Sequence, residues 1–75
     1  MLQISNHAIE RYAQRFMDFT ELESESLTHH QYCAIRNLLI DRFGHVVLPT
    51  CILNYKPWDA RIIIVDDVLV TITKQ

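Results

Sequence analysis

The sequence predicts an α+β fold in which two helices pack on one face of a three- to four-stranded antiparallel sheet, with the helices preceding the strands. Apolar residues recur at spacings of three and four in the first part of the chain, and at a spacing of two after Gly44. Hydrophobic residues make up 49% of the 75 residues, with only one glycine and two prolines. This composition is typical of a densely structured chain, so we expect a single domain over 1–75.

A domain of this length has a small apolar core. We expect it to bury only roughly 60–65% of the surface that the unfolded chain exposes, which makes its stability marginal. A second copy or a partner that covers the remaining apolar surface would stabilise it.

The helix expected over 6–17 begins at a polar cap, Ser5 or Asn6. Its apolar face is formed by Ala8, Ile9, Tyr12, Ala13, Phe16 and Met17. The glutamate-rich segment 18–27 that follows is expected to be a solvated connector, or at most a short polar helical turn.

The helix expected over 29–43 has boundary signals at both ends. Thr28 and Gln31 have the spacing of a capping box. Gly44 lies where many helices end in a left-handed residue. The apolar face between them contains Tyr32, Ile35, Leu38, Leu39 and Phe43.

Antiparallel strands are expected over 45–48, 51–56, 60–65 and 68–74, and the turn lengths between them determine the register. We expect a two-residue turn at Asp66–Asp67 and a three-residue loop at Pro57–Asp59. These lengths place Ile63 and Val65 under the helices, and Ile62 and Ile64 on the opposite face. That second face would then contact a partner or a second copy of the chain. A four-residue loop at Trp58 would overturn this register.

One short row of residues has the makings of a phosphodiester site. His7, Arg11 and Arg15 are four residues apart, so they lie along one edge of the first expected helix. Arginine offers a planar set of donors for phosphate or carboxylate, and histidine transfers protons near neutral pH. The alternative is that Arg11 and Arg15 only solvate the outer side of the helix and pair with nearby carboxylates.

Trp58 is the second candidate contact, between Pro57 and Asp59 at a hairpin tip. Its ring could stack on a base, fill a pocket of a partner, or fold back over the edge of the sheet. Three further cations on or beside strands could join the helix cations if the helix crosses the sheet near the strand ends: Lys56, Arg61 and Lys74.

The overall charge argues against a broad basic surface for nucleic acid. Seven Lys plus Arg stand against nine Asp plus Glu, for a net charge of −2. The opening MLQISNHAIE lacks the pattern of a signal peptide, and no apolar run approaches the ~20 residues of a membrane span. We therefore expect a cytoplasmic protein that makes no membrane contact.

The cysteines and histidines are expected to be structural. No CxxC pair is present, so Cys33 and Cys51 are expected to be reduced core residues. His29 and Cys33 share a helix face, but tetrahedral zinc needs about four ligands. The sequence predicts no metal site and no cofactor, and it contains no glycine-rich phosphate loop.

The opening ISNHAIERYAQRF resembles the H-A-x-x-R-x-x-x-R start of small bacterial and phage proteins of unknown function near the RelE and BrnT toxins, and the ending RIIIVDDVLVTITK is similar to their closing hairpin. The resemblance covers the two ends, about half of the chain. It implies metal-independent RNA cleavage, with His7 as acid or base and Arg11 and Arg15 on the phosphate. Such toxins are generally basic, and residues 71–75 here hold no Tyr or His to complete a proton-transfer pair.

Two function classes follow from the sequence. The first is a small phage or mobile-element accessory protein that binds and inhibits or modulates a host protein, ribonucleoprotein or RNA; its expected contacts are Arg11, Arg15, Lys56, Trp58, Ile62 and Ile64. The second is a RelE-like, toxin-type endoribonuclease that uses His7, Arg11 and Arg15. A homodimeric regulator that reads nucleic acid is a weaker third, because the acidic balance predicts poor and salt-sensitive binding. The sequence favours the binding protein.

Overall fold

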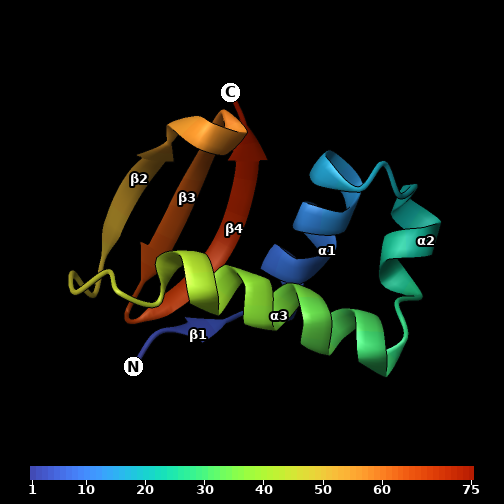
Figure 1. The fold of residues 1–75 in the computed structure, drawn as a ribbon, viewed down its shortest axis with the longest axis horizontal. Helices are drawn as coiled ribbons and strands as arrows, with labels where there is room; N and C mark the ends of the chain where they lie inside the picture. The colour runs from blue at the N-terminus through green and yellow to red at the C-terminus, as the bar shows by residue number, and fades with distance from the viewer.

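The computed structural model describes residues 1–75 and confirms the α+β fold (Figure 1). Its elements are β1 (Gln3–Ile4), α1 (Asn6–Phe16), α2 (Glu21–Glu25), α3 (His29–Phe43), β2 (Cys51–Tyr55), the 3-10 helix η1 (Lys56–Trp58), β3 (Ala60–Val65) and β4 (Val68–Lys74). The strands form one sheet in the order β1-β4-β3-β2. Because β1 pairs parallel to β4, the sheet is mixed, whereas a purely antiparallel sheet was expected.

Ser5 both begins α1 and ties it to the sheet. Its hydroxyl accepts a hydrogen bond from the N–H of Ala8 at 3.0 Å and donates one to the carbonyl of Val70 in β4 at 3.0 Å. The Ser5 N–H donates to the carbonyl of Leu69. The cap therefore fixes where α1 leaves the edge of the sheet.

The glutamate-rich segment contains a short helix, α2. Thr20 and Glu23 form a complete capping box, in which each side chain accepts a hydrogen bond from the backbone N–H of the other. This reciprocal cap starts a single polar turn, and the turn places Ser24 in the interior.

The helix α3 has the boundaries that the sequence predicts, including the capping box of Thr28 and Gln31. The expectation of a left-handed Gly44 is wrong, because its φ of −62° is right-handed. Gly44 instead allows a close approach: a Cβ atom added there would lie 2.5 Å from the Ile40 carbonyl oxygen.

The strand expected over 45–48 does not form, because this segment carries the chain from the end of α3 to the sheet. The Val46 N–H bonds to the carbonyl of Phe43, and the Pro49 carbonyl accepts from Asp67 in the turn between β3 and β4. These backbone groups therefore bond to a helix end and a turn instead of a neighbouring strand. Val47 and Leu48 are exposed on this segment.

The expected strand register is wrong because the loop between β2 and β3 has four residues, Lys56–Asp59. Tyr55 pairs with Ala60, and Asp59 takes the left-handed conformation with φ 51°. Ile62 and Ile64 therefore face the helices and are buried, at 0% and 1% exposure. Neither residue can be the surface contact that the sequence predicted.

The second hairpin agrees with the sequence at its turn but not along its length. Asp66 and Asp67 have φ of 51° and 64°, and Val65 pairs with Val68 as expected. A bulge then shifts the register, so that Ile63 pairs with Thr71.

The core lies between the inner face of the sheet and the helices. Its buried residues are Leu2, Ala8, Ile9, Ala13, Ile35, Leu39, Phe43, Ala60, Ile62, Ile64, Leu69 and Ile72. Small alanines on α1 allow this helix to approach the sheet closely. None of the helices is both long and apolar enough to cross a membrane.

Candidate functional site: an aromatic cluster with cations

The His7, Arg11 and Arg15 row lies on α1, and the structure connects its first two members. The Nε of Arg11 donates to Nε2 of His7 at 3.4 Å, and its Nη1 donates to Oε1 of Gln14 at 2.8 Å. The first bond requires that Nε2 of His7 be unprotonated. Arg15 is exposed in the last turn of α1.

Ser24 holds this row against α2. The Gln14 side-chain amide donates to the Ser24 hydroxyl at 2.6 Å, and that hydroxyl donates to the Glu21 carbonyl at 2.8 Å. Ser24 is fully buried, and its hydroxyl both accepts and donates a hydrogen bond. Sequence reasoning missed this link, because the capping box of Thr20 and Glu23 that predicts α2 was not recognised.

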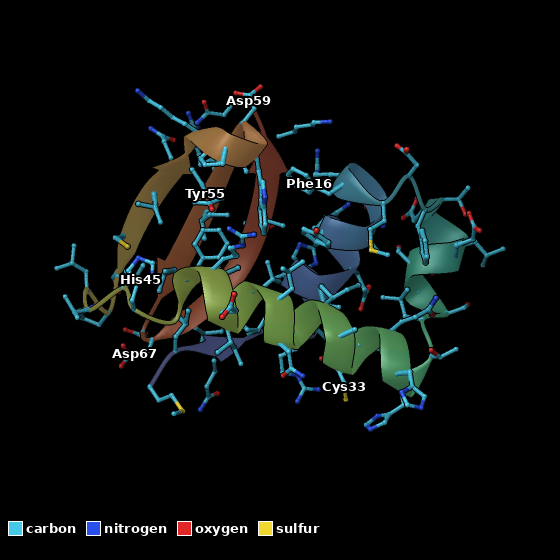
Figure 2. The ribbon with its side chains drawn as sticks, viewed as in Figure 1. Phe16, Cys33, His45, Tyr55, Asp59 and Asp67 are labelled. Atoms are coloured by element: carbon cyan, nitrogen blue, oxygen red, sulfur yellow. The ribbon has the colours of Figure 1, made fainter.

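On another side of α1, five aromatic rings meet in what we call the aromatic cluster: Tyr12, Phe16, Phe43, Tyr55 and Trp58. Trp58 is its centre, with ring centroids 5.5 Å from Tyr12, 5.9 Å from Phe16, 5.6 Å from Phe43 and 5.1 Å from Tyr55. Most of these pairs are tilted or edge-to-face, the geometry that aromatic quadrupoles favour. Figure 2 shows Phe16 lying between α1 and the sheet, and Tyr55 lying over the strands.

Trp58 is therefore not a free hairpin tip. The 3-10 helix η1 turns the loop back over the inner side of the sheet, so that the indole packs on α1 and α3. Phe43 is fully buried, whereas the other four rings keep part of their surface exposed. Of the interpretations that the sequence left open, folding back over the sheet describes the position of the ring.

Two cations lie over this cluster. Cζ of Arg42 is 5.8 Å from the centroid of Trp58, and Nζ of Lys74 is 5.7 Å from that of Phe16. Nη1 of Arg42 also donates to the Tyr55 hydroxyl at 3.4 Å. Burial raises the pKa of Tyr12 above its usual range, and the positive charge of Arg42 opposes part of that rise.

The remaining tyrosine joins two helices outside this site. The hydroxyl of Tyr32 on α3 donates to Oε2 of Glu10 on α1 at 3.1 Å. Burial raises the pKa of Tyr32, and its hydrogen bond to the Glu10 carboxylate raises it further. This contact links α1 and α3.

The predicted contact residues thus fall into three places, the first of which is the core, where Ile62 and Ile64 are buried. Lys56 and Trp58 lie together in η1 beside the aromatic cluster, and Lys56 is exposed. Arg11 and Arg15 lie on α1, with Arg11 turned toward Gln14 and α2. Arg42 was not predicted as a site residue. Its place in the last turn of the helix over 29–43, now α3, was the available signal.

His29 and Cys33 meet on α3, with Nε2 3.5 Å from Sγ. No three His, Cys, Asp or Glu side chains are grouped so that they could hold a metal ion. His45 follows the end of α3, far from Cys33 (Figure 2). Both cysteines are unpaired and half-buried.

The surface contains no enclosed pocket. No family model, no curated protein and no solved structure matches the chain.

Proposed function

We propose that this chain is a small binding protein that holds single-stranded RNA against its aromatic cluster without cleaving it. The sequence predicts an accessory protein that modulates a host macromolecule, and this proposal specifies single-stranded RNA as that macromolecule. The proposal rests on one observation. Partly exposed rings and cations lie together on one part of the surface, although the net charge of the protein is negative.

The cations come from separate parts of the sequence. Arg42 closes α3 and Lys74 closes β4, and each side chain lies over a ring of the cluster. Lys56 and Arg15 are exposed and are close in sequence to Trp58 and Phe16. This grouping supplies a local positive site without a broad basic field.

Five of the nine acidic residues lie elsewhere, whereas Asp59 follows Trp58 and Asp41 precedes Arg42 in the sequence. Glu21, Glu23 and Glu25 are exposed on α2, and Asp66 and Asp67 form the turn at the other end of β3 and β4. A polyanion would therefore be repelled from α2 and from the β3–β4 turn.

The rings can supply the second component of single-strand binding. Tyr12, Phe16, Tyr55 and Trp58 are only half-buried, so bases can stack on their exposed parts. Arg42 uses one donor on the Tyr55 hydroxyl, and its guanidinium has further donors for a phosphate oxygen.

In the binding experiment the protein is titrated into a short fluorescein-labelled single-stranded RNA in a buffer that contains EDTA. Fluorescence anisotropy measures binding, and a gel of the same samples shows whether the RNA is intact. We expect saturable, salt-sensitive binding of intact RNA. R42Q is expected to weaken binding about tenfold, because it removes one charged phosphate contact. R36Q is the matched control, since Arg36 is an exposed arginine on the same helix and is expected to leave the affinity unchanged.

Absence of binding by the wild-type chain at low salt would contradict the proposal. Equal loss of affinity in R42Q and R36Q would show only general charge attraction and would also contradict it. Equal affinity for single-stranded DNA would support a nucleic-acid site at the aromatic cluster but would contradict a preference for RNA.

A second candidate function is a metal-independent endoribonuclease, and the His7–Arg11 hydrogen bond favours it. In that case His7 would act as acid or base, with Arg11 and Arg15 on the phosphate. The side-chain hydrogen bond of His7 joins it to Arg11, which does not exchange protons near neutral pH, so this bond supplies no second proton-transfer group. Cleaved RNA in the wild-type gel lane that H7A leaves intact would establish this function in place of simple binding.

A further inference from the structure

The outer sheet face, which is turned away from the helices, is apolar at its centre. It consists of Ile52, Asn54, Arg61, Ile63, Val65, Val68, Thr71 and Thr73, as the strand pairing shows. Ile52 is 68% exposed and Val65 is 41% exposed. Figure 1 shows that all three helices lie to the right of the strands or in front of them, so none covers this face.

Charge is distributed unevenly along this face. Arg61 lies near the start of β3, and its cross-strand neighbours are the uncharged Asn54 and Thr73. Asp66 and Asp67 follow the end of the same strand, next to Val65 and Val68. The β3 segment therefore runs from a positive end, across an apolar centre, to a negative end.

We propose that two copies of this chain form a dimer by packing their outer sheet faces together with antiparallel strands. A two-fold axis level with the middle of β3, between Ile63 and Ile64, sets Arg61 of one copy opposite Asp66 of the other. By symmetry the same contact occurs twice. The outward side chains of β3 are at odd-numbered positions, so this axis offsets the two sets by one residue and lets them interdigitate.

The distribution of charge favours a second copy as the occupant. An interface around a two-fold axis must be complementary to itself, and a positive end, an apolar centre and a negative end along one strand meet that condition. The dimer leaves the aromatic cluster open, because the cluster lies on the inner side of the sheet. The dimer therefore does not depend on RNA binding, and either proposal can fail alone.

The test is sedimentation equilibrium of the full chain at concentrations from roughly 5 to 500 µM, where a weak dimer of this kind is detectable. We expect a concentration-dependent dimer. V65K and R61D are each expected to raise its dissociation constant at least about tenfold. L22K is the matched control, because Leu22 is an exposed apolar residue on α2 and its replacement is expected to have no effect.

A charge exchange separates this arrangement from other contacts. R61D alone and D66K alone each place like charges together, so each is expected to be monomeric. Their equimolar mixture restores both opposite-charge contacts and is expected to form a heterodimer. Circular dichroism of each variant checks that it is folded.

A wild-type chain that stays monomeric throughout the range would overturn the proposal. A dimer that persists in V65K and R61D would also overturn it and would indicate pairing of the free β2 edges. Failure of the folded R61D and D66K variants to associate when mixed would overturn the antiparallel arrangement.

Discussion

Cations lie on two sides of α1, in different surroundings. Toward α2, Arg11 uses its donors on His7 and Gln14, and Ser24 fixes Gln14 in turn. Toward the sheet, Arg42 and Lys74 rest over aromatic rings. Arg11 gives two donors to neighbouring side chains, whereas Arg42 gives one and lies over a partly exposed ring, so Arg42 keeps more donors for an anion.

The largest expected effect comes from removing the ring at the centre of the aromatic cluster. W58A leaves four rings without their common neighbour, and we expect it to lower the free energy of unfolding by about 3 kcal/mol. W58F keeps an aromatic face and is expected to lose about half of that. Urea denaturation followed by circular dichroism measures both variants, and a W58A chain as stable as the wild type would show that the cluster does not support the fold.

A smaller effect is expected on the α2 side. S24A removes the hydroxyl that accepts from Gln14 and donates to the Glu21 carbonyl, so two partners lose a hydrogen bond to a buried group. We expect a loss of about 1–2 kcal/mol in the free energy of unfolding. S26A is the matched control on an exposed serine, and an equal loss in both variants would contradict a specific role for Ser24.

The smallest effect concerns the titration of Tyr12. Burial raises its pKa and the charge of Arg42 lowers it, so R42Q is expected to raise the pKa of Tyr12 further. Because the pKa is raised in the folded chain, the contribution of Tyr12 to stability is complete below its unfolded pKa of about 10 and is lost as pH rises above it. R42Q should steepen that loss.

Alkaline titration of tyrosine absorbance, with Y12F to identify the component of Tyr12, measures this shift. An unchanged titration in R42Q would show that the Arg42 charge does not act on Tyr12.

The two hairpins show how far the sequence predicts the fold. The turn at Asp66–Asp67 follows from local chemistry, because two aspartates accept the left-handed conformation that a two-residue turn needs. The loop at Lys56–Asp59 does not, because a three-residue and a four-residue loop suit the same residues. Only packing of Trp58 on α1 and α3 decides between them, and that choice moves Ile62 and Ile64 into the core.

The candidate site was predictable only in its parts. Local pattern identified Trp58, Lys56 and the cations of α1 as chemically competent. The meeting of Arg42, Trp58 and Lys74 depends on three elements that are distant in sequence, and no local pattern reports their approach. The link through Ser24 was predictable in part, because the capping box of Thr20 and Glu23 predicts α2, whereas the contact of Ser24 with Gln14 on another helix has no local signal.

The most direct test of the account uses the fluorescence of Trp58, the single tryptophan of the chain. Titration with unlabelled single-stranded RNA is expected to quench this emission to saturation, with weaker binding in K74Q and unchanged binding in R11Q. Quenching that R11Q abolishes and K74Q leaves intact, or no change in emission while RNA binds, would contradict an RNA site at the aromatic cluster.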